Sequence, residues 1–317
     1  MTILDKSSIP TEKATTMRRV LMKIWRARYI YLICLPVVVY YLVIHYWSMG
    51  YLRMAFYDYK LRLGFEGSKF VGLKNFISFI NGYSFQSVIK NTLIINIYSI
   101  VFTFPFPILL AIMLSELHGI RFKRIVQTIS YLPHFLSAVV VVSLLNVMLS
   151  PSTGIVNGFF KLLGQESIYF MGSAEWFRPV YTFATIWQQT GWNAIVYIAA
   201  ISAIDSALYE AAKIDGAGKL RQIWHVTLPG IRGTISILLV LRIGNLFVNS
   251  FDKPYLMQNS LNLQVSELLS TYTYKIGMVN GKYSVSTAVG LLNSVVSLIL
   301  VVLANTVTKK LSDTSLF

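Results

Sequence analysis

Long apolar runs separated by shorter polar segments dominate this chain of 317 residues. Each run is close to the length of about 20 residues that an α-helix needs to cross a hydrocarbon core of about 30 Å. A soluble chain of this size can bury a core without several separate runs of that length. The pattern predicts an all-α, polytopic membrane helical bundle, with six main transmembrane helices at residues 29–49, 88–114, 125–149, 180–203, 231–251 and 285–307.

Aromatic residues and prolines refine the picture of the first two runs. Trp25 precedes the first run, Tyr29 begins it and Trp47 lies near its end, as is typical of aromatic anchors at a membrane interface. Pro105 and Pro107 interrupt the second run. Because proline lacks a backbone donor, we expect a kink in the second helix unless its neighbours or water satisfy the freed carbonyls.

The composition agrees with a membrane protein. Hydrophobic residues make up 55% of the chain and charged residues 13%, and the mean hydropathy is +0.59. The net charge of +15 would suggest nucleic-acid binding in a soluble protein, but the basic residues flank the apolar runs, so membrane orientation explains them better. We therefore expect no nucleic-acid partner. The single cysteine, Cys34, excludes an intrachain disulfide.

The distribution of Lys and Arg favours a cytoplasmic N-terminus and a cytoplasmic C-terminus. With this orientation 16 basic residues fall in cytoplasmic segments and 11 in external ones, although the first external segment, residues 52–87, carries five of the latter. The basic N-terminal segment is predicted to be an arm rather than a signal peptide, because the run after it is too long and lacks a small-residue cleavage site. The predicted organisation is a cytoplasmic arm at 1–28, a transmembrane permease domain at 29–308 and a cytoplasmic tail at 309–317.

The segment at about 205–229, between the fourth and fifth runs, is too polar for lipid but has helical periodicity. Leu208, Ala211 and Ala212 fall at positions i, i+3 and i+4, and Gly216 allows the backbone to turn. The pattern predicts a helix, a turn and a second short helix at the cytoplasmic face, where another protein can dock. The alternative is an ordinary connecting loop that packs on its own bundle.

The spacing of residues in this segment resembles the EAA loop of binding-protein-dependent ABC permeases. Glu-Ala-Ala is followed after three residues by Gly216, and after nine more by Val226, where isoleucine is commoner, one further residue and Leu-Pro. The resemblance implies an ABC importer type I permease-like fold, in which this loop forms the coupling helix that docks on an ATPase subunit. The residues implied in ATPase coupling are Glu210, Ala211, Ala212, Asp215, Gly216, Leu228 and Pro229.

Further stretches resemble the carbohydrate branch of that family, and within it the LplB-type permeases for oligosaccharides and polysaccharide fragments. The resemblance covers nearly the whole chain. The stretches that carry it are Ala55-Phe56-Tyr57-Asp58-Tyr59, residues 67–76, Phe122-Lys123-Arg124, Tyr131-Leu132-Pro133-His134-Phe135 and Gly191-Trp192.

The resemblance implies a bacterial importer in the plasma membrane that works by alternating access. Its implied partners are a second homologous permease, two ATPase subunits, an extracellular solute-binding protein, membrane lipid and an oligosaccharide. ATP and Mg²⁺ are expected in the ATPase, with no cofactor in this chain and no enzymatic activity of its own. The stretch from Gly216 to Lys219 departs from a phosphate-binding loop, because Lys213 replaces the first glycine and Leu220 the final Ser or Thr.

Arg242 is the main candidate for a substrate path. An unpaired arginine inside a membrane helix costs at least about 2.5 kcal/mol and should face protein or water. Asn245 and Asn249 lie at i+3 and i+7 from it, so the three define one polar face of the fifth helix. This face suits a sugar path, and a contact with another helix or with a second permease is the alternative. The basic excess favours an acidic, uronate-containing sugar, while a neutral oligosaccharide stays compatible.

A second polar and aromatic patch lies in the fourth run, at Gln188, Gln189, Trp192 and Asn193. Aromatic faces commonly stack on sugar rings, but packing at a subunit interface is the favoured explanation of this patch. The four histidines have no metal-ligand spacing and are predicted to be structural.

Two other functional classes remain as alternatives. An ion-gradient-driven secondary transporter is expected to carry inverted repeats and an intramembrane carboxylate, and the six predicted helices contain no Asp or Glu. A membrane receptor or scaffold would use the docking loop for another partner. Co-purification of an ATPase subunit, lost on replacement of Glu210 and Gly216, separates a transporter from such a scaffold.

Overall fold

The computed structural model describes residues 25–244 and 251–312, which fall into two compact units, residues 1–54 and 55–317. The described part of the first unit is one long helical segment, apolar enough to cross a membrane. The Arg28 guanidinium lies 5.0 Å from the ring of Trp25 and 4.7 Å from that of Tyr29, as expected near an interface. This confirms the first predicted helix, which consists of α2 (Arg28–Tyr40), a π-helical turn (Tyr41–Tyr46), α3 (Trp47–Met49) and a 3₁₀ turn (Gly50–Phe56).

The second unit begins with a small antiparallel β-hairpin that the sequence did not predict. Strand β1 (Tyr57–Lys60) pairs with β2 (Gly64–Phe70), with Tyr57 opposite Phe70, and α4 (Lys74–Ile80) follows. The amide of Asn75 donates hydrogen bonds to the carbonyls of Ala55 and Tyr57, both at 2.9 Å. This buried side chain therefore holds β1 against the start of α4.

The second predicted span is present, and its prolines are accommodated by a π-helical turn. Helix α5 (Phe85–Tyr98) continues through the turn Ser99–Thr103 into α6 (Pro105–Glu116), and the three segments together form one candidate span. Phe104 N–H donates to the carbonyl of Ser99, five residues back, at 3.1 Å. Because Pro105 stands at the start of α6, its missing donor breaks no bond of a regular helix.

The third predicted span is not one continuous helix, so this part of the prediction is wrong. Helix α7 (Ile120–Tyr131) and a 3₁₀ turn (Leu132–Phe135) are bent by 100° from α8 (Ala138–Met148). Pro133 lies in the turn, and Ser137 caps α8 because its hydroxyl accepts a hydrogen bond from Val140 N–H at 3.3 Å.

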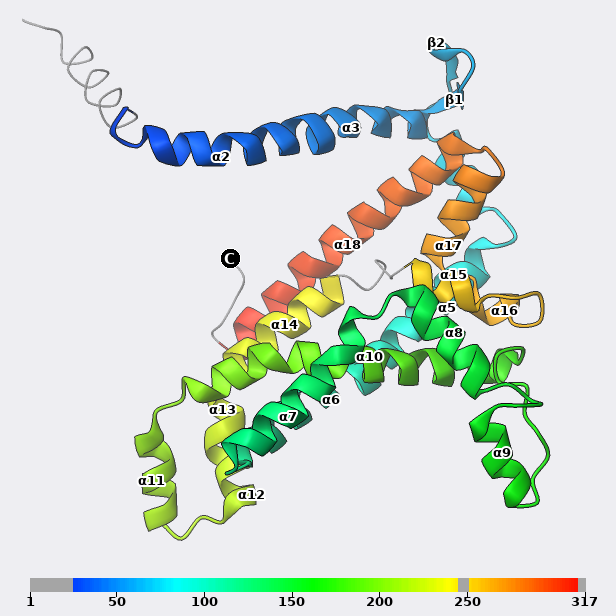
Figure 1. The fold of residues 1–317 in the computed structure, drawn as a ribbon. Coiled ribbons are helices and arrows are strands. Elements are labelled where there is room, and N and C mark those ends of the chain that lie inside the picture. Colours follow the sequence, from blue (N-terminus) through cyan, green and yellow to red (C-terminus); the bar gives the residue numbers. More distant parts are fainter. Residues whose placement is uncertain (1–24, 245–250, 313–317) are drawn as a thin grey trace, which may run out of the picture. The chain divides into compact units, whose positions relative to one another are not determined.

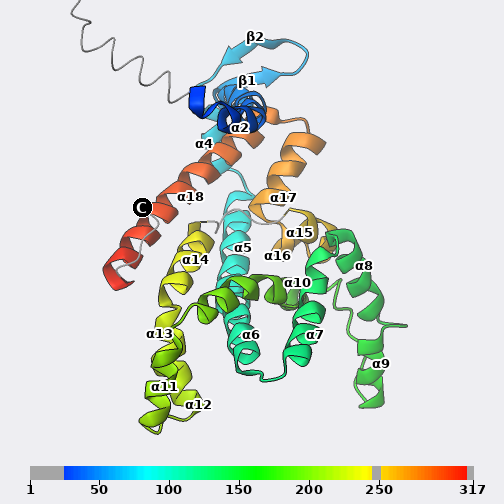
Figure 2. The ribbon, with the colours of Figure 1, turned by 60° about the vertical axis from the view of Figure 1, so that its left-hand side comes forward.

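The fourth span is α10 (Ala174–Ser202), which begins six residues before the predicted start and lies at the centre of the second unit. It packs against α6 and α7 (Figures 1 and 2). A Cβ atom on Gly191 would lie 2.0 Å from the carbonyl oxygen of Ser130, so α10 and α7 meet backbone to backbone there. Two buried clusters line α10, one around Phe177 and Val180 and one around Ala194 and Tyr197.

Beyond α10 the chain forms a helical hairpin and returns. The elements are α11 (Ser206–Ile214), α12 (Lys219–Gln222), a π-helical turn (Ile223–Thr227), α13 (Leu228–Gly230) and α14 (Arg232–Gly244). Helix α14 covers the first part of the predicted fifth span, whose later residues 245–250 lie outside the described part of the chain. Figures 1 and 2 place this hairpin and the β1–β2 hairpin at opposite ends of the second unit.

Short helices and one long helix complete the second unit. They are α9 (Ile155–Leu162), α15 (Asp252–Met257), α16 (Leu263–Ser266), α17 (Leu269–Tyr274), a π-helical turn (Lys275–Val279) and α18 (Tyr283–Ser312), which contains the sixth predicted span. The described residues hold three helices that can each cross a membrane, or up to six spans if each bent pair counts as one.

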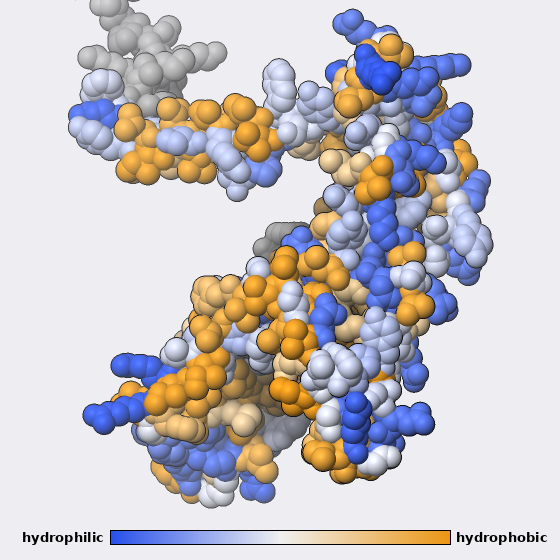
Figure 3. Space-filling view, turned by 45° about the vertical axis from the view of Figure 1, so that its right-hand side comes forward, coloured by the Kyte–Doolittle hydropathy of each residue, from blue (hydrophilic) through white to orange (hydrophobic). Residues whose placement is uncertain are grey.

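The apolar surface of the described residues fits a lipid environment. In Figure 3 the long first segment is apolar along its middle and hydrophilic at both ends. On α18, Leu298 and Leu303 are exposed as well. Because exposed apolar area of this extent is unusual on a soluble monomer, these surfaces face lipid or other subunits. The all-α class is thus confirmed, apart from the short β-hairpin, and the described helices are consistent with six spans if each bent pair counts as one.

Candidate functional site

The predicted helix, turn and helix at 205–229 is present in the structure. The Asp205 carboxylate accepts a hydrogen bond from Ala207 N–H at 2.9 Å and so caps α11. At the other end Gly216 has a φ of +76°. Ala217 N–H donates to the carbonyl of Ala212 at 2.8 Å, and Gly216 N–H donates to that of Lys213 at 3.0 Å. These two bonds form a Schellman motif, which stops the helix at the glycine.

Most of the predicted coupling residues lie on the surface of this hairpin. Glu210, Ala211, Asp215, Gly216 and Pro229 are exposed, whereas Ala212 and Leu228 are partly buried. No residue of α11 is fully buried, so most of its surface is open to a partner.

The inward side of the hairpin connects it to the rest of the second unit. Within the hairpin, the hydroxyl groups of Tyr209 and Thr227 are 3.0 Å apart. Lys219 Nζ lies 2.5 Å from a carboxylate oxygen of Glu116, at the end of α6. Leu228 packs against the buried cluster that contains Tyr197. A force applied to the hairpin can therefore be transmitted directly to α6 and α10.

The exposed side of the hairpin also carries large apolar side chains. Leu208, Leu220 and Trp224 are 55%, 75% and 67% exposed. Exposed groups of this kind next to polar residues are typical of a protein interface. The described hairpin thus has the properties of a docking surface.

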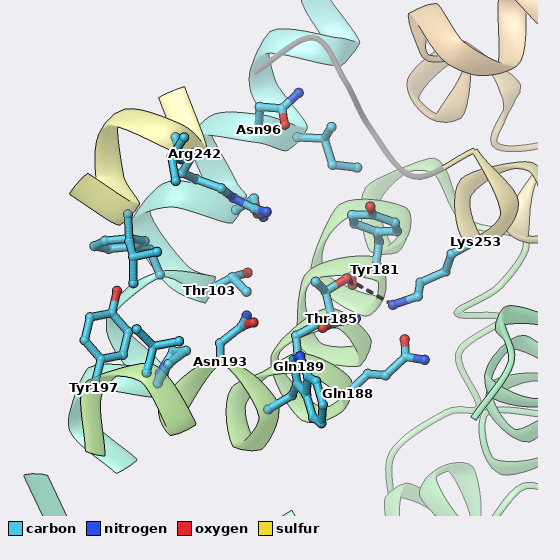
Figure 4. Close-up of a pocket in the computed structure, with 18 of the residues that line it drawn as sticks. Asn96, Thr103, Tyr181, Thr185, Gln188, Gln189, Asn193, Tyr197, Arg242 and Lys253 are labelled. Carbon is cyan, nitrogen blue, oxygen red and sulfur yellow. Dashed lines mark hydrogen bonds between the residues drawn. The ribbon is translucent and has the colours of Figure 1, made fainter. Parts of the chain in front are cut away.

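A cavity of about 590 Å³ lies in the middle of the second unit, between α5, α6, α10, α14 and α15. Figure 4 shows polar side chains from these helices pointing into it. Arg242, Gln188, Trp192 and Asn193 all line the cavity, so the structure brings together two patches that the sequence analysis treated separately. Asn245 and Asn249 lie outside the described residues.

The α10 wall of the cavity is also a packing site. Gln188 Nε2 donates to the carbonyl of Leu136 at 2.8 Å, and Gln189 Oε1 lies 3.1 Å from His134 Nδ1. The ring of Trp192 stacks on that of His134 with 4.4 Å between centroids and 4° between planes. These contacts fix the bend between α7 and α8 against α10, and they give His134 a structural role as predicted.

Some polar groups on this wall remain available to a ligand. Trp192 is 41% exposed and Asn193 is exposed. Amides, hydroxyls and an aromatic face are the groups that commonly bind sugars.

Two cations line the cavity. Arg242 donates a hydrogen bond to the hydroxyl of Ser99, and Arg242 is exposed in this chain without its partner subunits. Lys253, on α15, is only 6% exposed, and its Nζ lies 3.4 Å from the hydroxyl of Thr185 and 5.8 Å from the centroid of the Tyr181 ring. None of the described residues that line the cavity is acidic.

Sequence reasoning missed Lys253. A lysine just after an apolar run is ordinarily read as part of an external loop or as an interfacial anchor. In the structure α15 folds back onto α10, so that Lys253 reaches Thr185. Thr185 is well inside α10: at 1.5 Å per residue it lies about 16 Å along the helix axis from the first residue, Ala174. Only the absence of Asp and Glu from the neighbouring apolar runs could have signalled an unpaired cation.

Apolar spans around a polar cavity are typical of a membrane transport protein. Residues 103–313 match the family described as "Binding-protein-dependent transport system inner membrane component", and the chain belongs to that family. It is thus a permease subunit of a bacterial ABC importer, not an enzyme, and as such it is a multi-pass protein of the inner membrane.

Individual relatives match over almost the whole chain. The chain is 44% identical to the "Polygalacturonan/rhamnogalacturonan transport system permease protein YteP" of Bacillus subtilis (strain 168), over 95% of this chain and 94% of YteP. It is 42% identical to "Protein LplB" of the same organism, over 92% of each. A permease chain in the crystal structure of a "bacterial alginate ABC transporter in complex with alginate pentasaccharide-bound periplasmic protein" aligns with a TM-score of 0.86 and 37% identity, covering 94% of this chain and 100% of that one.

Proposed function

We propose that this chain passes an acidic oligosaccharide, or a fragment of an acidic polysaccharide, across the plasma membrane through the cavity beside α10. The observation that carries the proposal is the cavity itself, whose polar wall includes Arg242 and whose described lining residues include no carboxylate. A carboxylate sugar gains charge-assisted hydrogen bonds from such a site, while a negatively charged wall would repel it.

The relatives support this substrate class. YteP is named as a transport permease for polygalacturonan and rhamnogalacturonan, and a solved structure with 38% identity and a TM-score of 0.84 is of a transporter "involved in the import of the acidic polysaccharide alginate". All of these polymers contain uronic acids. The polar cavity in this chain is consistent with a cargo of the same class.

We further propose that the α11–α12 hairpin docks on an ATPase subunit that binds ATP and Mg²⁺. Glu210, Ala211, Asp215 and Gly216 are the exposed residues expected at that contact. The complete importer then holds this chain, a second homologous permease, two ATPase subunits and an extracellular solute-binding protein. Both termini lie in the cytoplasm, with the arm at 1–28, the permease domain at 29–308 and the tail at 309–317.

Uptake by the reconstituted importer tests the proposal. The chain, its second permease, the ATPase and the solute-binding protein are placed in liposomes, and uptake of a labelled oligogalacturonate is compared with that of a neutral oligosaccharide of equal length. We expect ATP-dependent uptake of the acidic sugar only. Equal uptake of both sugars would contradict the acidic substrate class.

The same assay tests the alternative of a secondary transporter. Uptake that needs an ion gradient and continues without ATP would contradict ATP-driven import.

Replacement of Arg242 by Gln is expected to lower uptake of the acidic sugar about tenfold or more, because it removes a cation from the cavity wall. Uptake unaffected by Arg242→Gln would remove Arg242 from the substrate path.

A further inference from the structure

Lys253 is a buried cation for which the described residues supply no counter-charge. The ion pairs among these residues join Lys219 to Glu116 and Lys275 to Glu267, and neither involves Lys253. The adjacent Asp252 is exposed and makes no ion pair with it. A buried ammonium group is normally paired with a carboxylate. Lys253 is therefore suited to bind an anion that comes from outside the chain.

The contacts of Lys253 hold it in place without neutralising it. Its ammonium group has three donors, of which one is directed at the Thr185 hydroxyl. The ring of Tyr181 lies within the range of a cation–π contact. The remaining donors are available to the cavity that Lys253 lines.

Arg242 enters the same cavity from the other side. Figure 4 shows its guanidinium on α14 and the amine of Lys253 on α15 directed inward from opposite walls, with the side chains of Tyr181 and Thr185 on the Lys253 side. The guanidinium has five donors and binds a carboxylate at two points, so it keeps free donors beyond its bond to Ser99.

Polar side chains of α10 occupy the wall between the two cations. Asn193 supplies an amide that can bind sugar hydroxyl groups, and the same wall includes Thr185 and Gln189, which also contact Lys253 and His134. The volume of about 590 Å³ lies within the range of about 300–1,000 Å³ found for ligand pockets, so a short segment of a sugar chain fits.

We propose that Lys253 and Arg242 are two separate carboxylate-binding points, so that the cavity selects a sugar segment that carries at least two uronates. This inference rests on the proposed function, and it adds a substrate requirement, the number of carboxylates, and a specificity-determining residue, Lys253. A sugar with one uronate occupies one of the two cations and leaves the other unpaired.

The test is uptake by the reconstituted importer of three labelled tetrasaccharides with no, one or two uronates. In the wild type we expect uptake to rise with each carboxylate. Lys253→Gln should lower uptake of the two-uronate sugar about tenfold, to the level of the one-uronate sugar, because one binding point is lost. Lys253→Arg keeps the charge and should keep the preference for two uronates. Lys161→Gln, on the exposed surface of α9, is the matched control and should change nothing.

The outcomes separate this inference from the proposed function. Equal uptake of the one- and two-uronate sugars by the wild type, with the neutral sugar excluded, overturns the two-point site and leaves acidic import in place. Equal uptake of all three sugars overturns both. If Lys253→Gln does not assemble into the importer, Lys253→Arg decides, since loss of the two-uronate preference in an assembled Lys253→Arg importer also contradicts the two-point site.

Discussion

At the end of α11, Gly216 has a φ of +76°, in the left-handed region that costs other L-residues about 1 to 2 kcal/mol. A Cβ atom there would meet nothing within 4 Å, so the requirement for glycine is conformational and not steric. The neighbouring Gly218 also has open space around it, but its φ is −67°. The two glycines therefore give a matched pair for testing the turn.

Gly216→Ala is expected to strain the Schellman turn by about 1 kcal/mol and to loosen the hairpin without removing any contact. The importer should assemble, and ATP-driven uptake should fall severalfold because α11 no longer holds one orientation. Uptake measured in liposomes with Gly218→Ala as the control checks this. Loss of uptake to the same extent in both variants would count against a special role for the left-handed turn.

Some functional residues could be predicted from the sequence alone, and others could not. Gly216 and its turn could be predicted, because a local pattern of helix, glycine and helix is sufficient. Lys253 could not, because its burial depends on α15 folding back onto α10. Arg242, Gln188 and Trp192 could each be identified as unusual, but only the fold brings them to one cavity.

At the scale of elements, the bend between α7 and α8 depends on the close approach of α10. The stretch Tyr131 to Phe135 forms the bend, which packs against Gly191 and Trp192 of α10. The Ser130 carbonyl lies where a side chain at position 191 would be, and the ring of His134 stacks on Trp192. Two short stretches far apart in the sequence thus form one packing site.

Gly191→Ala is expected to destabilise the importer by about 1 to 3 kcal/mol, because the added methyl group overlaps backbone atoms of Ser130 and forces α7 and α10 apart. The melting temperature of the purified complex in detergent checks this. Gly290→Ala on α18 is the control, because a Cβ atom there meets nothing within 4 Å, and it should leave the melting temperature unchanged. A melting temperature for Gly191→Ala equal to that of the wild type would contradict the close contact.

The elements that the sequence predicted are those with a continuous hydropathy signal. The helices were found because a membrane span requires a long apolar run. The 100° bend between α7 and α8 was missed because the apolar residues continue through it and Pro133 alone does not specify its angle. The β1–β2 hairpin was missed because it is short, and the buried Asn75 that holds it is distant from β1 in sequence.

In the second unit as a whole, packed helices connect a cavity beside the middle of α10 to the α11–α12 hairpin beyond its end. The Glu116–Lys219 ion pair and the packing of Leu228 connect the hairpin to α6 and to the cluster around Tyr197, and Tyr197 also lines the cavity. Movement of the hairpin by a partner can therefore reach the cavity through rigid, packed helices.

Site-specific cross-linking shows whether this hairpin contacts an ATPase on the cytoplasmic side and can transmit work from it. The only native cysteine, Cys34, is replaced by Ser, and Ala211→Cys on α11 provides a single reactive thiol. Leu61→Cys, at the exposed tip of the β1–β2 hairpin, is the control for the external face. We expect Ala211→Cys to cross-link to the ATPase subunit and to be protected from an impermeant maleimide in intact cells, while Leu61→Cys is labelled. Labelling of Ala211→Cys from outside the cell, or no cross-link to the ATPase in the assembled importer, would contradict this contact.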